Sequence, residues 1–311
     1  MLQSDRLVPV SLQTGPMALA GSTRMQSSTI LMLALGLCFE FQWNKQMSLY
    51  DRWQHFTEFL TNQSYGMLQA FTEWESAHVN SQQKVLYLAD EWALPVFTDT
   101  TERAPTFSMA AMSVEGDMLS QRSSLTNVAL MGTTSGNEAW QRLLFREPKA
   151  LNWKDPRTTN QHLDQFDFSE NFGRRWLRAH ASQNCVEVKK HSNSLHFLFG
   201  DEITFPLQSL NAWEQHCLVK VLMNAHSTCM MGRVGRFQNN IMTWVKPSNG
   251  KLIDRAARYV MYLLHQGGYE EFDYDVIVEK IFELRNETLN EEPIVQRVYE
   301  ALIQKQLRVL G

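Results

Sequence analysis

Short β-type runs that alternate with helical segments in the middle of the chain constrain its fold most. KVLYLAD (84–90), SLTNVALMG (124–132) and CVEVKK (185–190) are apolar runs of strand length. Helical patterns lie between the second and third of them, at EAWQRLLF (138–145) and ENFGRRWLRAHA (170–181). Strands that alternate with helices favour a parallel sheet. The sequence therefore predicts an α/β fold, with a parallel sheet between two layers of helices.

Two further segments are candidate strands. KALNWK (149–154) has the composition of a third strand, and the polar residues 155–168 after it are typical of a loop. LHFLF and EITFP, within 195–206, fit either short strands or a turn.

Helices are expected on both sides of this region. Aromatic and Leu residues at spacings of three and four indicate two helices within 46–78, with a turn near Asn62–Gly66. An apolar helix is expected before them, around 30–39. A long buried helix at 209–237 follows the strands. The remaining segments form a helical tail at 251–266, 276–286 and 293–307.

The charge balance argues against nucleic acid and membrane surfaces as partners. The chain has 29 Lys and Arg against 33 Asp and Glu, a net charge of −4, so no basic field attracts polyanions. Its longest apolar run, Ile30–Phe39, is well short of the roughly 20 residues that span a bilayer. We expect no signal peptide, no membrane anchor and a cytoplasmic location.

The cysteines and histidines suggest no metal or cofactor. Cys38, Cys185, Cys217 and Cys229 form no C-x-x-C pair and match no zinc spacing, so buried, reduced thiols in a reducing compartment are expected. The nine His include no H-x-x-x-H pair, and no G-x-S-x-G nucleophile elbow occurs. We therefore expect neither a metal site nor a cofactor.

The first candidate binding segment is TTSGNEAW (133–140), where a β-type run gives way to a helix. Backbone N–H groups and the helix dipole converge at such a point, which suits phosphate, and Thr134 and Ser135 add hydroxyls. The alternative is a capping box made by Ser135 and Glu138, which needs no ligand.

The second candidate is Gly21-Ser22-Thr23-Arg24. Hydroxyls beside a guanidinium can hold a phosphate or a sugar hydroxyl, because Arg offers a forked contact. The alternative is a helix N-cap followed by a solvated Arg24.

The third candidate is Lys251, at the start of the helix in PSNGKLIDRA (247–256). A lysine in the first turn opposes the helix dipole, which suggests that its charge serves another purpose. The alternative is an ordinary surface lysine.

Two segments that are about 200 residues apart resemble one family. GPMALAGSTRM (15–25) resembles the signature G-P-E-x-[IV]-[AS]-G-S-[ST]-R-[LM]-K-x-G of SIS-domain proteins that include N-acetylmuramic acid 6-phosphate etherases and glucokinase regulatory proteins. NAHSTCMMGRVGRFQNNIMTWVKPSNGKLIDRA (224–256) resembles that family's other shared segment, with S-T-C for S-T-G, then G-R, N-I-M and N-G-K-L in the same order.

The separation of the two segments suggests a particular member of the family. In the etherases they lie close together, whereas in glucokinase regulatory proteins a second SIS domain lies between them. The resemblance implies a remnant of a first SIS domain at 1–45, an SIS-like α/β domain at 46–245 and a C-terminal helical region at 246–311. The expected fold is thus an SIS-type three-layer sheet followed by helices.

The resemblance also implies a site and a function. It assigns Ser22, Thr23, Lys251 and, more weakly, Arg24 to a sugar phosphate, and the TTSG stretch looks like the S-x-S-G-x-T phosphate loop of SIS domains. The implied function is a regulatory protein that binds a hexose phosphate and modulates a partner such as a sugar kinase, with a homo-oligomer also open.

Departures from the signature bear on catalysis. Met17 stands where the family has Glu, Gln26 where it has Lys, and Ser28 where it has Gly. The first domain's phosphate loop and catalytic Glu would precede Met1, so a partner chain or a longer protein would supply them. The alternative function, an etherase or a phosphosugar isomerase, therefore stays open, and the sequence identifies no catalytic residue.

Overall fold

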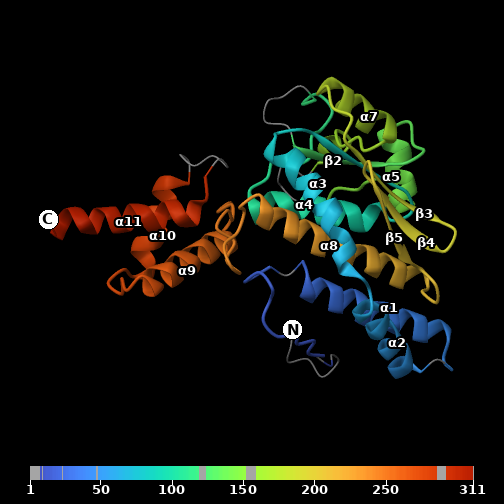
Figure 1. The fold of residues 1–311 in the computed structure, drawn as a ribbon, viewed down its shortest axis with the longest axis horizontal. Helices are drawn as coiled ribbons and strands as arrows, with labels where there is room; N and C mark the ends of the chain where they lie inside the picture. Colours follow the sequence, from blue (N-terminus) through green and yellow to red (C-terminus); the bar gives the residue numbers. More distant parts are fainter. Residues whose placement is uncertain are drawn as a thin grey trace.

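The protein is described from a computed structural model, which has a central sheet, helices on both of its faces and a projecting group of C-terminal helices (Figure 1). The structure describes residues 8, 10–22, 24–46, 48–118, 124–151, 159–285 and 292–310, with backbone alone for 305–310.

The sheet has five strands in the order β2-β1-β3-β4-β5. Its strands are β1 (Val85–Ala89), β2 (Thr126–Leu130), β3 (Cys185–His191), β4 (Ser194–Leu198) and β5 (Glu202–Pro206). β1 is central and pairs in parallel with both β2 and β3, with Val85 opposite Thr126 and Leu86 opposite Cys185. β3, β4 and β5 pair antiparallel. The predicted α/β class is confirmed, and the sheet is mixed.

The antiparallel half follows from the short connections in that part of the chain. A parallel pair needs a crossover of a dozen or more residues, usually with a helix. Two residues separate β3 from β4 and three separate β4 from β5, so only hairpins are possible. Ser192, in the first hairpin, adopts the left-handed conformation (φ 53°) that tight hairpin turns require. The segment 195–206 therefore forms strands rather than a turn.

Alternate residues of β1 face two different helical layers. Leu86 and Leu88 join the apolar cluster of α7 (Glu170–Ala179), which includes Phe172 and Trp176. Val85, Tyr87 and Ala89 face the opposite layer and the larger core. That layer consists of α3 (Leu68–Asn80), α4 (Ala93–Phe107) and α8 (Ala212–Arg233) (Figure 1). Helix α5 (Gly136–Leu144) contributes Ala139 and Trp140 to the same core. The three-layer prediction is confirmed.

Helix α4 was not predicted, although it covers β1 and contacts α8. Its sequence, ALPVFTDTTERAPTF, contains Pro95, Pro105 and four threonines, which all lower helix propensity. Pro95 lies in the first turn, where its missing N–H costs little. Burial of Val96 and Phe107, together with the ion pair between Arg103 and Glu75, stabilises the helix despite its weak local signal.

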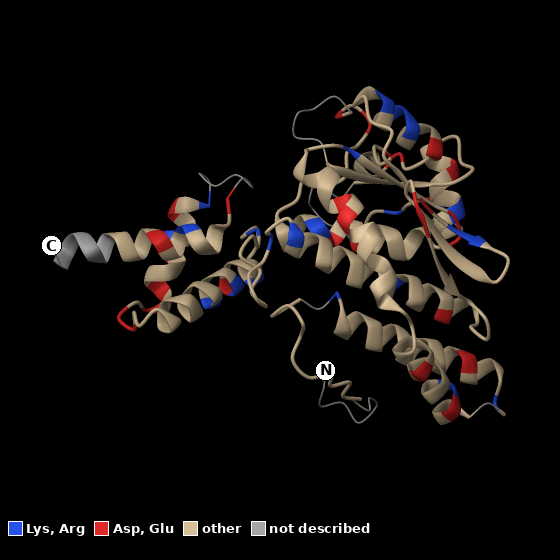
Figure 2. Cartoon of the chain, in the orientation of Figure 1, with Lys and Arg blue, Asp and Glu red and all other residues tan. Residues whose placement is uncertain are grey.

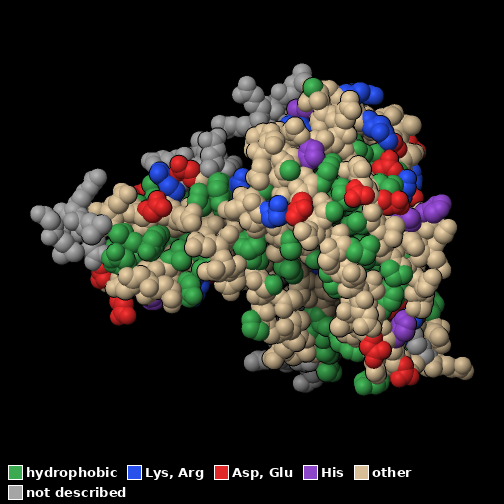
Figure 3. Space-filling model, in the orientation of Figure 1, with side chains coloured by type: hydrophobic (Ala, Val, Ile, Leu, Met, Phe, Trp, Pro, Cys, Tyr) green, Lys and Arg blue, Asp and Glu red, His purple; other side chains and the backbone are tan. Residues whose placement is uncertain are grey.

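The two helices expected within 46–78 are α2 (Leu49–Thr61) and α3, joined by the short helix η1 (Tyr65–Met67). Before them, α1 (Gln26–Trp43) packs on α8 through Leu33 and Leu37. Its other face exposes an apolar stripe at every fourth position, formed by Leu31, Leu35, Phe39 and Trp43. Figure 3 shows hydrophobic side chains along the lower edge of the molecule, where Figure 1 places α1 and α2. Within the described ranges no helix combines the length and the apolar character needed to cross a membrane.

The helical tail is confirmed as α9 (Gly250–Gln266), α10 (Tyr274–Leu284) and α11 (Ile294–Leu310). These helices share a second core, built around Val260, Ile281 and Val298. Leu19, from the segment before α1, belongs to the same core, so this segment packs on the C-terminal helical region.

Two sequence-based expectations for residues 149–168 differ from the structure. Residues 149–151 of the proposed strand KALNWK form no strand, and the rest of it lies outside the described residues. A four-residue helix, α6 (Asn160–Leu163), lies in the stretch expected to be loop. The division at 45 and 245 stays a prediction.

Close packing of α7 on the sheet yields a test. A Cβ at Gly173 would lie 2.8 Å from the Ala129 Cβ and 2.9 Å from a Leu86 methyl, so Gly173→Ala should destabilise the fold by about 1–3 kcal/mol despite the better helix propensity of Ala. Gly66→Ala is the control, because a Cβ there meets nothing within 4 Å. Urea unfolding measures both. Equal stability of the two variants would show that α7 does not pack as described.

Candidate functional site

The TTSG loop, Thr133–Gly136, connects β2 to α5 at the carboxyl end of the parallel strands. Ser135 is the N-cap of α5, and its Oγ accepts the Glu138 backbone N–H at 3.3 Å. Thr134 donates its backbone N–H (2.8 Å) and its hydroxyl (2.9 Å) to Oε2 of Glu138. The Gly132 N–H donates to Oε2 of Glu170 at 2.7 Å. Two carboxylates therefore accept hydrogen bonds that a phosphate would otherwise accept.

The charges of these carboxylates oppose an anion in the TTSG loop. Hydrogen bonds from Thr134 lower the pKa of Glu138. Burial would raise the pKa of Glu170, but the Gly132 N–H and Arg174 lower it overall. Ser135 caps α5, as the alternative expects, but Glu138 accepts from Thr134 rather than from the Ser135 N–H, so the capping box itself is not formed. Phosphate binding by Thr134 and Ser135 stays a prediction.

The GSTR loop, Gly21–Arg24, lies against α9. Ala20 donates its N–H to the Asn240 carbonyl at 2.8 Å, and the Tyr259 hydroxyl donates to the Ala20 carbonyl. Arg255 donates to the Gly21 carbonyl at 2.5 Å. Gly21 has a φ of 72°, and a Cβ there would lie 2.8 Å from the Arg255 guanidinium. The two segments that resemble the SIS family, over 200 residues apart in sequence, are therefore in contact.

The predicted residues of this region have different environments. Ser22 is buried, and Thr23 lies outside the described residues. Lys251 is exposed in the first turn of α9, one turn before Arg255. Asn249 caps this helix by accepting the Leu252 N–H at 3.1 Å. The predicted N-cap at residues 21–23 is wrong, because α1 begins after Met25 without a side-chain cap.

Arg24 is buried rather than solvated, so that alternative is also wrong. Its guanidinium pairs with Asp99 at 3.1 Å and donates to the hydroxyls of Ser227 (3.1 Å) and Thr228 (3.3 Å). Burial lowers its pKa, and the Asp99 charge acts against that effect. Arg24 thus ties the GSTR loop to α4 and α8.

Lys220 of α8 holds the end of the same loop. Its Nζ donates to the Arg24 carbonyl at 2.8 Å, to the Thr29 hydroxyl at 2.7 Å and to Oδ1 of Asn224 at 2.9 Å. Asn224 in turn donates to Asp99 at 2.8 Å. Burial lowers the pKa of Lys220 to about 8.

These groups lie at one end of an open cavity of about 680 Å³ between α1, α4 and α8, which we call the lysine cavity. Its other walls are largely apolar, and they include Met32, Phe39 and Trp213. Of the predicted site residues that the structure describes, Arg24 alone is among those that line it. The cavity combines a charged end with an apolar body, as many small-molecule sites do.

A second polar cluster continues from Asp99 into the interior. Arg103 lies 3.5 Å from Oδ2 of Asp99 and pairs with Glu75 at 2.6 Å. Glu75 also contacts the Tyr87 hydroxyl at 2.7 Å and Nε2 of His226 at 2.6 Å. Burial would raise the pKa of Glu75, but the Arg103 charge and the His226 hydrogen bond bring it to about 2. Burial lowers the pKa of His226, although the Glu75 carboxylate acts against that effect.

The sequence interpretation missed Lys220, Asn224 and the Glu75 cluster. A signal was present, because Lys220, Asn224 and Thr228 are spaced by four and so lie on one face of a helix whose segment 217–223 is apolar apart from Lys220. That spacing marks a polar stripe facing the interior. In the part of the chain that the structure describes, no group of three or more His, Cys, Asp or Glu side chains could hold a metal ion.

The fold and the contacting segments define a class, an α/β protein whose architecture is consistent with an SIS-type fold. No protein-family model matches the chain. The chain is 27% identical over 171 residues to N-acetylmuramic acid 6-phosphate etherase 1 of Bacillus licheniformis, which covers 52% of this chain and 54% of that protein. It is also 27% identical over 170 residues to the N-acetylmuramic acid 6-phosphate etherases of two Lactococcus lactis subsp. cremoris strains, covering 52% and 55%.

The chain therefore spans about half the length of the curated relatives it matches. A distant relationship to this family of SIS-domain etherases is confirmed over about half of the chain. The closer resemblance to glucokinase regulatory proteins stays a prediction.

The buried Glu75 cluster yields a prediction for stability. Glu75→Gln removes the closer of two carboxylates that pair with buried Arg103 and leaves Asp99, 3.5 Å away, which should cost about 3–5 kcal/mol in the free energy of unfolding. Glu73→Gln, two residues away, removes an exposed pair with Arg233 (3.7 Å) and should change stability by less than about 1 kcal/mol. Urea unfolding at neutral pH compares the two. Similar losses in both variants would contradict the described cluster.

Lys220 yields a prediction for pH dependence. Its pKa is about 8 in the folded protein against the ordinary lysine value of 10.5, so the unfolded chain holds this proton to higher pH. Between roughly pH 8 and 10 the folded state has lost the proton and the unfolded chain still holds it. The free energy of unfolding therefore rises by about 2 kcal/mol over that range. Lys220→Met should lack this rise. Parallel pH profiles of the two proteins would show that Lys220 titrates normally.

Proposed function

We propose that the chain binds a hexose 6-phosphate between the GSTR loop and the first turn of α9. The observation that carries the proposal is the contact between these segments, through Tyr259 with Ala20 and Arg255 with Gly21. The relatives support the ligand class, since their names specify a 6-phosphosugar.

Charge at the start of α9 favours a phosphate there. A helix N-terminus presents unpaired N–H groups and a positive dipole end. Lys251 adds a cation in the first turn and Arg255 another one turn later, and Figure 2 shows further basic segments along α9 and the loop before it. We assign the phosphate to Lys251 and the α9 N-terminus, and sugar hydroxyls to Ser22 and Thr23.

Arg24 has a positioning role in this proposal. Its guanidinium is already engaged by Asp99, Ser227 and Thr228, and Lys220 holds its carbonyl. These contacts hold Arg24, two residues after Ser22. Arg24 would act on the ligand through the loop rather than by touching it.

Two roles are compatible with this site. A regulatory protein would couple phosphosugar binding to a partner such as a sugar kinase, through different affinities of two conformations for the ligand. The second candidate, cleavage of N-acetylmuramic acid 6-phosphate, is favoured by the names of the relatives. Mass spectrometry of that substrate after incubation with the protein tests the second role directly.

Calorimetric titration with glucose 6-phosphate, fructose 6-phosphate and N-acetylmuramic acid 6-phosphate tests binding itself. Lys251→Ala should lower the affinity for the phosphosugar about 10- to 100-fold, because it removes a charge-assisted contact to phosphate. Lys149→Ala, at an exposed lysine outside these segments, should leave affinity unchanged.

Two results would reject the proposal. One is the absence of heat with all three phosphosugars for the intact protein. The other is a phosphosugar that binds the Lys251→Ala protein as tightly as the native chain.

A further inference from the structure

The outer face of α1 carries the exposed apolar stripe of Leu31, Leu35, Phe39 and Trp43. No Asp, Glu, Lys or Arg occurs between Gln26 and Phe39. The opposite face of the helix packs on α8 (Figure 1). A helix that is apolar around its circumference is normally buried on all sides. Within the described ranges, the outer face of α1 therefore lacks the partner that its composition calls for.

The stripe is continuous with the mouth of the lysine cavity. Leu35 and Phe39 line that cavity from α1, and Leu94, which is also exposed, lines it from α4. The centroids of the Phe39 and Trp43 rings lie 6.1 Å apart. We call Leu31, Leu35, Phe39, Trp43 and Leu94 the α1 patch. A protruding ring, that of Trp43, thus lies beside a hollow on one surface.

The area of the α1 patch fits one side of a protein interface. Its five residues are 49–81% exposed. They offer about 500–600 Å² of apolar surface, since a large aromatic side chain contributes about 150–250 Å² and a leucine somewhat less. A stable interface takes about 800 Å² from each partner, of which roughly 60% is apolar. The patch therefore supplies the apolar share of one side of such an interface.

The shape of the α1 patch favours a second copy of this chain as the partner. In a two-fold contact the same surface serves both sides, so each pair of contacting residues occurs twice. Leu35 and Trp43 lie eight residues apart, about 12 Å along α1, with Phe39 midway. A two-fold axis at Phe39 lays the two α1 helices antiparallel and places each Trp43 at the mouth of the other copy's lysine cavity. The ring of one copy then meets the hollow of the other.

The absence of charge on the patch supports the same choice. None of its five side chains is ionisable, so a charged peptide finds no counter-charge on it, whereas two identical apolar surfaces meet without burying an unpaired charge.

We propose that the chain forms a two-fold dimer through the α1 patch, in which the Trp43 ring of each copy enters the lysine cavity of the other. The proposal does not depend on phosphosugar binding, since none of the groups assigned to the phosphosugar belongs to the patch.

Sedimentation velocity on the full chain tests the dimer. The native protein should be dimeric at about 10–50 μM, above the micromolar dissociation constants of the weakest interfaces of this size. Trp43→Glu and Leu35→Glu each place a carboxylate in the apolar contact and should yield monomers. Phe145→Glu, at a 92% exposed ring outside the patch, is the matched control and should stay dimeric. Circular dichroism confirms that each variant is folded. A native monomer, or dimers that persist in both patch variants, would overturn the proposal.

A cross-link tests the arrangement of the two helices. Cys38 is exposed and adjoins Phe39. Because packed helix axes lie about 8–10 Å apart, the proposed axis brings the two Cys38 thiols within reach of a short bismaleimide. The native protein and Phe145→Glu should yield a covalent dimer, and Cys38→Ser should yield none. Cross-linking through the exposed Cys229 in place of Cys38 would contradict the proposed contact.

Discussion

The polar interior of the α/β body depends on the ion pair between Glu75 and Arg103. Both side chains are buried, and a carboxylate in the interior is tolerated only when a cation and hydrogen bonds compensate it. Tyr87 and His226 supply those hydrogen bonds from β1 and α8. The cluster therefore fixes the positions of α3, α4, α8 and the central strand together.

The same cluster connects to the GSTR loop through Asp99, which contacts both Arg103 and Arg24. The Arg24 side chain joins the loop to Asp99, and Lys220 donates to the Arg24 carbonyl. The loop geometry thus rests on charges that lie in the core as well as on the local turn at Gly21.

The sequence predicted the elements with strong periodicity and missed those stabilised by tertiary contacts. The runs around β1, β2 and β3 and the helices α7 to α11 carry their own signals, so their existence and type were predicted. Helix α4 has a weak local signal and forms because it buries Val96 and Phe107 and pairs Arg103 with Glu75. For the site, the resemblance predicted that the segments of Ser22 and Lys251 belong together, and the structure shows these segments in contact. A motif could not show that Arg24 pairs with Asp99, because that contact joins residues 75 positions apart.

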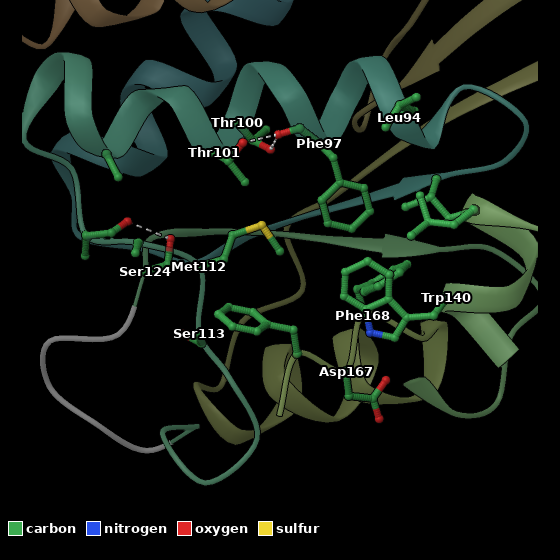
Figure 4. Close-up of a pocket in the computed structure, with 16 residues that line it drawn as sticks. Leu94, Phe97, Thr100, Thr101, Met112, Ser113, Ser124, Trp140, Asp167 and Phe168 are labelled. Carbon is green, nitrogen blue, oxygen red and sulfur yellow. Dashed lines mark hydrogen bonds between the residues drawn. The ribbon is translucent and has the colours of Figure 1, made fainter. Parts of the chain in front are cut away.

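Leu94, the second residue of α4, lines the lysine cavity and also a second cavity of about 350 Å³ that Trp140 and Phe168 help to line (Figure 4). Leu94 is 49% exposed, so its side chain keeps rotamer freedom that closer packing would restrict. One leucine thus forms part of two cavity walls, and a change of its size alters both cavities at once.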